Sequence, residues 1–410
     1  MITIHEALDA VLSAVSPLAA EDTAFLEALG RVAAEDIVSP EQVPAFANSA
    51  MDGFAVSGEE LEAGRREFAV VADVPAGRFV AEPVGPGAAA RIMTGAPLPP
   101  GVDTVVQVEH TSAVADRVTI DEAPPRGANV RRAGEDVDVG DVLFGRGACL
   151  GPAEVGLLAA VGVQRVAVFR RPRVAILATG SELVGPGLPL APGQIRNSNS
   201  FTAYGQTIEA GAEPTLLGVA KDDVEETRRL FASALEHDVV ITSGGVSVGD
   251  YDFVKQVQDE LGVERRFWGV ATKPGKPLAF GVRGRTLVFG VPGNPVAAMV
   301  CFELYVRPAL LALQGRADVY RPYVFAHSEE PVASTKERTE ARRCRLVHRD
   351  RGWGFTTTGP QGSGILSSMA GAEGYVFVPP RYPGGPIGTE LLVTLLAGES
   401  TARPPYPGGD

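Results

Sequence analysis

Hydrophobic runs and polar loops alternate regularly between residues 173 and 313. Short β-branched apolar runs predict strands that are buried on both faces, and each is followed by polar loops or by apolar residues at helical spacing. The predicted strands cover residues 174–178, 215–219, 239–241, 278–282 and 286–289, and the predicted helices cover 201–210, 224–235, 251–261 and 295–313. This alternation indicates βαβ units, and therefore a mostly parallel sheet with helices on both faces.

The pattern differs on either side of this unit. Ile4, Leu8, Val11 and Leu12 fall on one face of an expected first helix, and a second amphipathic helix is expected over 23–35. Short β-like runs broken by Gly and Pro follow at 68–71, 104–108 and 117–120. These runs are typical of a small β domain inserted into another unit. A further helix is expected to begin at Pro152.

Helix signals disappear after residue 321. Short runs at 346–347, 375–378 and 391–395 predict a small β barrel or sandwich. Residues 399–410 are rich in Pro and Gly, and we expect a disordered tail there.

Composition limits the class of protein. A chain of 410 residues is too long for one core. Its net charge of −13 argues against a nucleic-acid partner, so any anionic substrate must be held by local Lys and Arg. Three cysteines and five scattered histidines give no Cys/His metal spacing. With no basic leader and no uninterrupted apolar run long enough for a bilayer, we expect a cytoplasmic protein without a membrane partner.

Three loops after predicted strands carry the residues of an anion site. Thr179, Gly180, Ser181 and Glu182 follow the first strand, and the loop 290–295 follows the last. The third strand is followed by Thr242, Ser243, Gly244, Gly245 and Ser247, then by Asp250 and Asp252. Free backbone N–H groups at such strand ends bind anions, and glycines let the backbone approach them. Any one loop could be an ordinary βα turn, but three in one sheet indicate a site.

Carboxylates and lysines add to this interpretation. Glu182, Asp222 and Asp252 are hard oxygen ligands suited to Mg²⁺, although Asp222 could instead cap a helix. Lys273 and Lys276 lie three residues apart on the proline-stiffened KPGKP turn, as a cationic clamp for a phosphate or oxyanion. Three polar loops outside the α/β unit contain Asp52, Thr94 and Asp136. Taken alone, each loop is more typical of an ordinary turn than of a catalytic site.

The order of nine motifs resembles a known family. They are MDGFAV, RIMTGAPLP, RRAGED, ATGSEL, QIRNSN, SGGVSVGDYDF, KPGKPLAFG, VPGNPV and GSGILSSM. Together they resemble the MoeA-type molybdopterin molybdenumtransferases, equivalent to the E domain of gephyrin, from Met1 to about Leu396. The resemblance implies insertion of molybdate into adenylylated molybdopterin, with Mg²⁺-dependent release of AMP.

The resemblance also implies the architecture. It predicts a multidomain α/β plus β fold: an α/β molybdopterin-binding domain (1–19 and 170–318), a linker domain (20–40 and 139–169), an inserted β domain (41–138) and a C-terminal β barrel (319–398). It further implies an elongated homodimer whose active site is shared between subunits. A molybdopterin adenylyltransferase and molybdoenzymes are the implied protein partners.

By motif, the resemblance assigns roles to individual residues. Glu182, Asp222 and Asp252 would serve the metal and pyrophosphate, Lys273 and Lys276 the anion, and the loops at 179–181 and 242–247 the pterin and phosphates. Asp52, Thr94 and Asp136 would reach the cleft of the other subunit. Pro292 and Pro295 would shape a loop, and the molybdate side would be lined by Arg338, Arg343, Ser363, Ser367 and Ser368. Two alternatives stay open: molybdopterin adenylylation, and a scaffold that only binds cofactor intermediates.

Overall fold

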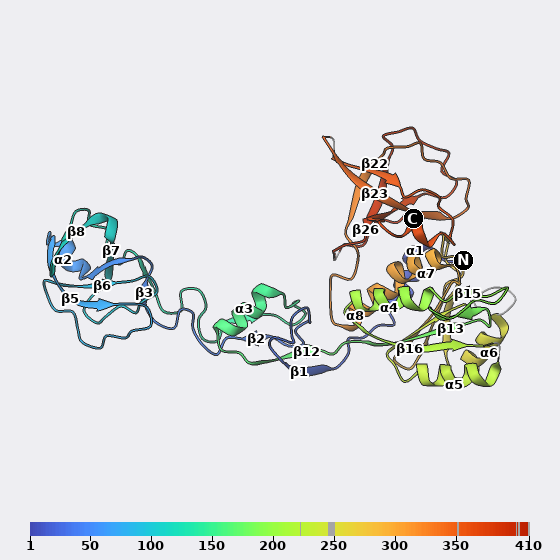
Figure 1. The fold of residues 1–410 in the computed structure, drawn as a ribbon, viewed down its shortest axis with the longest axis horizontal. Coiled ribbons are helices and arrows are strands. Elements are labelled where there is room, and N and C mark those ends of the chain that lie inside the picture. The colour runs from blue at the N-terminus through green and yellow to red at the C-terminus, as the bar shows by residue number, and fades with distance from the viewer. Residues whose placement is uncertain (222, 245–250, 351, 399, 401, 409–410) are drawn as a thin grey trace.

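The computed structural model describes residues 1–221, 223–244, 251–350, 352–398, 400 and 402–408, with the side chains of 251–253 left out. The molecule is elongated (Figure 1). The inserted β domain lies at one end, a narrow middle part contains α3, β1, β2 and β12, and the α/β unit with the barrel forms the other end. Both termini lie at this last end, so the chain leaves the α/β unit, reaches the far domain and returns.

The α/β unit is built on one six-stranded sheet. Its strands, in spatial order, are β16 (Glu213–Ala220), β13 (Arg173–Thr179), β17 (Val239–Ser243), β21 (Thr286–Val291), β20 (Ala279–Arg283) and β18 (Glu264–Trp268). The first four are parallel, and the last two are antiparallel to their neighbours. The mostly parallel sheet is confirmed. The sequence pattern does not predict β18, because Phe267 is its only buried residue.

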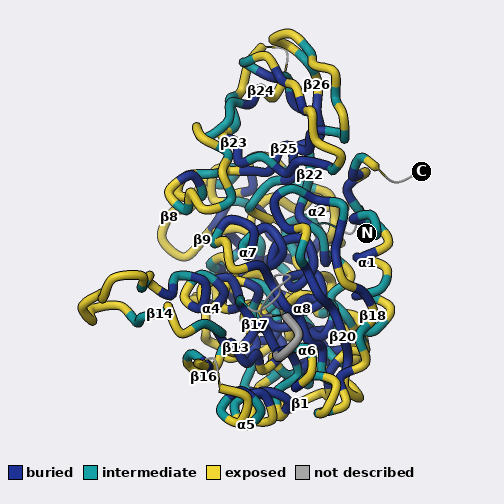
Figure 2. The backbone as a smooth tube through the Cα atoms, turned by 90° about the vertical axis from the view of Figure 1, so that its right-hand side faces the viewer, coloured by how far each residue is buried: buried dark blue, intermediate teal, exposed yellow. Residues whose placement is uncertain are grey.

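Helices cover both faces of this sheet, as predicted. On one face α5 (Val224–Ala234) and α6 (Tyr251–Glu260) bury Phe231 and Val257 against Val240. On the other face lie α1 (Ile4–Leu12), α4 (Asn199–Glu209), α7 (Pro295–Cys301), a π-helical segment (Phe302–Val306) and α8 (Arg307–Leu313). Figure 2 shows how the buried residues are concentrated in the middle of this unit, whereas the segment near β14 (Leu183–Val184) and β15 (Ile195–Arg196) projects into solvent.

The helical stretch Pro295–Leu313 is the one part of the described chain that is long and apolar enough to cross a membrane. In the structure 89% of its apolar window is buried inside the protein. Its hydrophobicity therefore matches its position as the central core helix.

The first helix forms where it is expected. Thr3 and Glu6 make a reciprocal capping box at its start, with N···O distances of 3.2 and 2.7 Å. The second helix expected over 23–35 is wrong: β1 (Ala20–Ala24) pairs with β12 (Arg165–Phe169), and turns follow. Pairing with a distant strand has outweighed the local helical periodicity.

The rest of the linker region also combines two distant segments. β2 (Ile37–Val38) pairs with β11 (Val142–Phe144), and α3 (Pro152–Ala160) begins at the expected proline. Ile37, Leu158 and Val168 belong to the small core that these segments share.

The inserted domain is a six-stranded sheet with a core around Phe54, Phe68 and Val106. Its strands, in spatial order, are β7 (Thr104–Gln107), β4 (Gly53–Val56), β6 (Ala88–Ile92), β5 (Glu67–Val74), β9 (Arg117–Ile120) and β8 (Thr111–Val114). Its remaining elements are α2 (Gly58–Glu62), the 3₁₀ turn Val108–His110, and β3 (Asn48–Ser49) paired with β10 (Val130–Arg131).

The C-terminal strands close into a barrel, as predicted. The strands are β23 (Thr339–Arg349), β24 (Gly352–Thr357), β22 (Tyr323–Ser328), β26 (Glu390–Leu395) and β25 (Gly374–Val378), and the barrel closes because β25 also pairs with β23. A 3₁₀ turn, Leu366–Ser368, lies between β24 and β25. The short strand β19 (Thr272–Lys273) of the α/β unit pairs with the start of β23, which joins the two domains through backbone hydrogen bonds.

The final segment, for which the sequence predicts disorder, is packed in its described part. Tyr406 is 6% exposed and lies 4.8 Å from the Phe377 ring and 5.7 Å from the His5 ring, between centroids. Arg403 donates to the Asp9 carboxylate at 2.6 Å. An aromatic side chain at a position rich in Pro and Gly has found an apolar site between α1 and the barrel, and composition alone does not reveal this.

We expect Tyr406→Ala to lower the free energy of unfolding by about 3 kcal/mol, because a large buried aromatic side chain is lost. Tyr406→Phe keeps the ring and should stay within about 1 kcal/mol of the parent protein. Chemical unfolding of both variants measures this. Equal stability of Tyr406→Ala and the parent would mean that the segment is not packed in solution.

Candidate functional site

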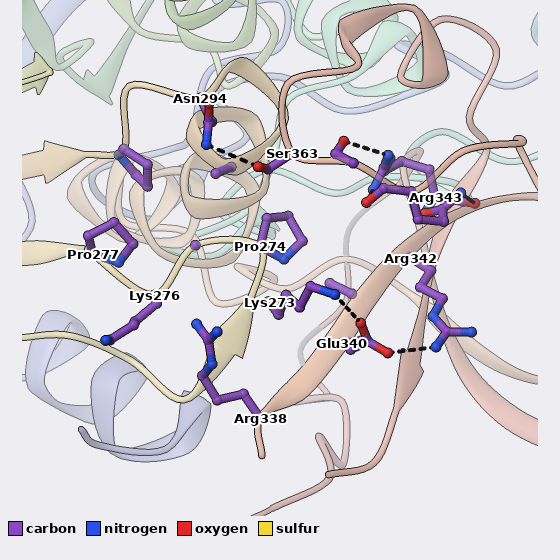
Figure 3. Close-up of a pocket in the computed structure, with 16 residues that line it drawn as sticks. Lys273, Pro274, Lys276, Pro277, Asn294, Arg338, Glu340, Arg342, Arg343 and Ser363 are labelled. Atoms are coloured by element: carbon purple, nitrogen blue, oxygen red, sulfur yellow. Dashed lines mark hydrogen bonds and ion pairs between the residues drawn. The ribbon is translucent and has the colours of Figure 1, made fainter. Parts of the chain in front are cut away.

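A cavity of about 560 Å³ lies where the α/β unit meets the barrel. Four segments form its walls: the KPGKP turn at the end of β19, the start of α7, the first half of β23, and the loop 361–363 (Figure 3). The cavity is therefore built by residues that lie far apart in the sequence and meet only when the two domains pack.

Positive charge dominates the cavity. Five cationic side chains line it, against a single carboxylate among the described residues, that of Glu340; the five are Lys273, Lys276, Arg338, Arg342 and Arg343. Glu340 Oε1 lies 2.9 Å from Lys273 Nζ, and its Oε2 lies 2.6 Å from an Arg342 nitrogen. The remaining excess of positive charge makes the cavity suitable for a small anion.

The Glu340 carboxyl stays ionised at neutral pH. Burial by itself raises its pKa, but hydrogen bonds from Lys273, Ser334 and Arg342 outweigh this and lower the pKa to about 2. The carboxylate therefore holds two of the cations in fixed positions.

Lys276 and Arg338 are not held by Glu340. Arg338 donates to the Thr272 carbonyl at 3.2 Å. The Lys276 side chain is exposed, and its ammonium makes no hydrogen bond or ion pair to the described residues. The turn that carries Lys276 requires Gly275: its φ is +107°, and a Cβ there would lie 2.9 Å from Cys301 Sγ. This close approach explains the glycine in the KPGKP motif.

Arg343 is fully buried and organises the loop beside the cavity. Its guanidinium donates to the Ser368 hydroxyl at 2.8 and 3.0 Å and to the carbonyls of Pro360, Gln361 and Gly362 at 3.1–3.2 Å. Burial lowers the pKa of Arg343. Ser368 is turned toward Arg343 and Ser367 is exposed, so this loop brings only Ser363 of the three predicted serines into the cavity.

Ser363 is tied to the start of α7. Its hydroxyl accepts from Asn294 Nδ2 at 3.0 Å (Figure 3). Its carbonyl accepts from the Val296 N–H at 3.1 Å. Pro292 lines the cavity, and Pro295 is the first residue of α7, where its fixed φ suits a helix start.

The second part of the site lies at the carboxyl ends of β13 and β17. Thr179 Oγ1 donates to the Ser243 carbonyl at 3.4 Å, and Gly244 has φ +91°, with an imagined Cβ only 2.5 Å from the Thr179 carbonyl oxygen. Thr242 is fully buried and donates to the Phe289 carbonyl at 3.4 Å, so its hydroxyl points into the sheet. Gly180 and the exposed Ser181 follow β13.

Of the three predicted metal ligands, Glu182 is the one whose side chain the structure describes. It is exposed, and its carboxylate lies over Gly180, since a Cβ on that glycine would be 2.4 Å from Glu182 Oε2. Asp222, Gly245, Ser247, Asp250 and the side chain of Asp252 lie outside the described residues. Within the described part of the chain no group of three or more His, Cys, Asp or Glu could hold a metal ion, so the three-carboxylate set stays a prediction.

Asp52, Thr94 and Asp136 are not brought to this cavity within one chain. Asp52 and Thr94 belong to the inserted domain at the other end of the molecule (Figure 1), and Asp136 lies between β10 and β11. The N–H and hydroxyl of Thr94 donate to Asp52 Oδ1 at 2.7 and 2.8 Å and lower the pKa of this exposed carboxyl. Asp136 is also exposed.

Three polar residues of the site are not identified from the sequence: Glu340, Asn294 and Asn199. Asn199 Nδ2 donates to Ser243 Oγ at 2.7 Å and to the Gly293 carbonyl at 2.8 Å. Asn199 and Asn294 lie within the QIRNSN and VPGNPV motifs, and an asparagine at the first turn of a helix after a polar loop is the signal that could have indicated them.

Three sequence families match this chain, in order along it. Residues 2–162 match the MoeA N-terminal region (domain I and II), residues 175–312 match a probable molybdopterin binding domain, and residues 326–396 match the MoeA C-terminal region (domain IV).

Individual proteins give the same assignment. Molybdopterin molybdenumtransferase 2 of Mycobacterium tuberculosis is 38% identical over 379 residues, covering 90% of this chain and 93% of the relative. Molybdopterin molybdenumtransferase of Haemophilus influenzae is 40% identical over 329 residues, covering 80% and 81%. A crystal structure of the molybdopterin biosynthesis MoeA protein from Pyrococcus horikoshii matches with a TM-score of 0.82 at 35% identity, covering 97% of this chain and all of that one.

Because these similarities run along nearly the whole length of the protein, the chain belongs to the MoeA family of molybdopterin molybdenumtransferases.

Proposed function

We propose that this protein inserts molybdenum from molybdate into adenylylated molybdopterin and releases AMP. The observation that carries the proposal is the strongly cationic cavity at the junction of the α/β unit and the barrel. Relatives named molybdopterin molybdenumtransferase, similar over most of their length, support the same activity.

The cavity is the proposed molybdate site. Molybdate is a small dianion, and Lys276 and Arg338 supply charge that is not already paired with Glu340. The Ser363 hydroxyl accepts from Asn294, so its own hydrogen is available for an oxyanion oxygen. Lys273, fixed by Glu340, adds positive potential at the same place.

The carboxyl ends of β13 and β17 are the proposed site for the phosphates and the pterin. Gly244 has no Cβ, so a ligand can approach the backbone closely at the end of β17. The Thr179 and Ser243 side chains lie beside this glycine. Glu182 stands beside it and would hold Mg²⁺ together with Asp222 and Asp252, since all three are hard oxygen donors. Bound there, the metal would neutralise and polarise the phosphoanhydride that water must cleave.

We further propose that two subunits share each site. Asp52, Thr94 and Asp136 are exposed polar residues far from the cavity of their own chain, and a homodimer would let them serve the cavity of the partner. Molybdopterin adenylyltransferase and molybdoenzymes would supply the substrate and accept the product.

The direct test is AMP release from adenylylated molybdopterin in Mg²⁺, with and without molybdate. Molybdate-dependent AMP release that yields active cofactor supports the insertase. Formation of the adenylylated pterin from ATP would support the adenylyltransferase, and binding without turnover would support a scaffold.

The Asp252→Asn variant should still bind substrate but should no longer release AMP in the same assay. If its AMP release is unchanged, Asp252 does not belong to the metal ligands.

The shared site predicts complementation between two inactive variants. Lys276→Ala changes the cavity, and Asp52→Asn changes the inserted domain. In a mixed dimer, the intact cavity of the Asp52→Asn subunit meets the intact inserted domain of the Lys276→Ala subunit, so one of the two sites is intact. Random reassembly makes about half of the dimers mixed, and activity should recover to about one quarter of the parent value.

The control mixes Lys276→Ala with Glu182→Gln, two changes on the α/β unit, which leave every site of a mixed dimer damaged. If the first mixture recovers no more activity than this control, the site does not combine Asp52 with the partner's cavity.

The ion pairs of Glu340 predict a pH dependence of stability. Its pKa of about 2 lies below the usual 4.5, so its stabilisation is complete above about pH 4.5 and is lost as the pH falls toward 2. Glu340→Gln should therefore be less stable by up to about 3 kcal/mol at pH 7, and the difference should shrink at pH 3.

Chemical unfolding at both pH values measures this difference. Glu337→Gln is the control. Glu337 lies just before Glu340 in the sequence and forms an exposed ion pair with Arg381, so the Glu337→Gln variant should differ little from the parent in stability. A Glu340→Gln difference that is the same at both pH values would contradict the role of the ionised carboxylate.

A further inference from the structure

Asn199 connects the two parts of the site. It is the first residue of α4 and is 9% exposed. Its Nδ2 lies 2.7 Å from Ser243 Oγ at the end of β17, and 2.8 and 3.4 Å from the carbonyl oxygens of Gly293 and Pro292 in the loop before α7. One amide group therefore contacts the end of β17 and the loop that follows β21, two neighbouring parallel strands.

These partners determine which way the amide faces. The carbonyls of Pro292 and Gly293 can only accept hydrogen bonds, so the atom that faces them must be the nitrogen. Its two hydrogens then go to the Gly293 carbonyl and to Ser243 Oγ, the two nearest acceptors.

The amide also orients the Ser243 hydroxyl. Because Ser243 Oγ accepts from Asn199, its own hydrogen must point elsewhere, and it donates to no atom of the described residues. Ser243 is 5% exposed and ends the strand from which the glycine-rich loop leaves. A hydroxyl hydrogen directed away from α4 at this strand end is a donor for a phosphate or pterin oxygen.

The other hydrogen of the amide acts on the cavity. Gly293 immediately precedes Asn294, whose Nδ2 donates to the Ser363 hydroxyl in the cavity. A continuous path of contacts thus runs from Ser243 at the end of β17 to the proposed molybdate site, through Asn199, Gly293, Asn294 and Ser363.

The oxygen of the same amide indicates that this orientation has a cost. Asn199 Oδ1 is buried and has no hydrogen-bond partner among the described residues. A buried unpaired acceptor is unfavourable, and proteins tend to keep such groups where function requires them.

We propose that Asn199 is a positioning residue for the transfer reaction. Its amide directs the Ser243 hydroxyl hydrogen toward bound adenylylated molybdopterin and holds the 292–294 loop that places Asn294 against Ser363. The inference rests on the proposed function, because it takes Ser243 to contact that substrate.

The test is a double-mutant cycle on AMP release, measured against the concentration of adenylylated molybdopterin. Asn199→Ala and Ser243→Ala should each lower kcat/KM by about 10-fold, the usual effect of losing one hydrogen bond to a charged group. Because Asn199 acts partly through Ser243, the double variant should lose about 20-fold rather than the ~100-fold of independent effects. A double loss equal to the product of the single losses overturns the proposal.

Asn199→Asp provides a matched change of hydrogen bonding at constant shape. The carboxylate accepts from Ser243 and so reverses that hydroxyl, and it cannot donate to Gly293. We expect about a 10-fold loss of kcat/KM in this variant that largely disappears in the Ser243→Ala background. A loss of equal size in both backgrounds counts against the proposal.

Asn197→Ala is the control for a merely structural asparagine. Asn197 is 7% exposed, and among the described residues its side chain bonds only to Ser200, within its own turn. It should lower the melting temperature and leave kcat/KM within about twofold. If Asn199→Ala does not fold, the cycle with Asn199→Asp decides; if neither folds, Asn199 is a folding residue and the proposal is wrong. Absence of turnover in the parent protein would instead remove the proposed function itself.

Discussion

The junction of β19 with β23 is the constraint on which the site depends. Two residues of the α/β unit pair with the barrel, Thr272 with Thr339 and Lys273 with Glu340. Directly beside this pairing, Glu340 forms ion pairs with Lys273 and Arg342. Cationic side chains repel one another, so a cavity that gathers five of them needs a rigid frame. The backbone pairing and one buried carboxylate supply it, and no carboxylate of the described residues pairs with Lys276 or Arg338.

A second set of contacts joins the cavity to the α/β sheet. Arg343 is buried and holds the loop that carries Ser363, and Asn294 and Val296 at the start of α7 bind Ser363 directly. Asn199 continues this connection to the end of β17. The cavity and the carboxyl end of β17 therefore share supporting contacts, so the proposed anion site and the proposed phosphate and pterin site are held by one set of side chains.

The elongated shape has its own consequence. The inserted domain lies far from the cavity of its own chain (Figure 1). In this domain Asp52 and Thr94 are exposed and are hydrogen-bonded to each other. A polar pair that is ordered and exposed at the end of a long arm is well placed to meet another molecule, and a second copy of the chain is the proposed one.

The sequence by itself determined the α/β unit, because buried parallel strands and their covering helices leave local signatures in apolar spacing. It also predicted the barrel, and motif order identified the family. Lys273 and Lys276 line one cavity, and their role as an anion clamp stays a prediction. The helix expected over 23–35 failed because β1 pairs with a strand more than a hundred residues away. The packed Tyr406, the Glu340 carboxylate and the Asn199 amide were decided only by the tertiary structure. Their roles depend on which distant groups they meet, and local sequence does not record such contacts.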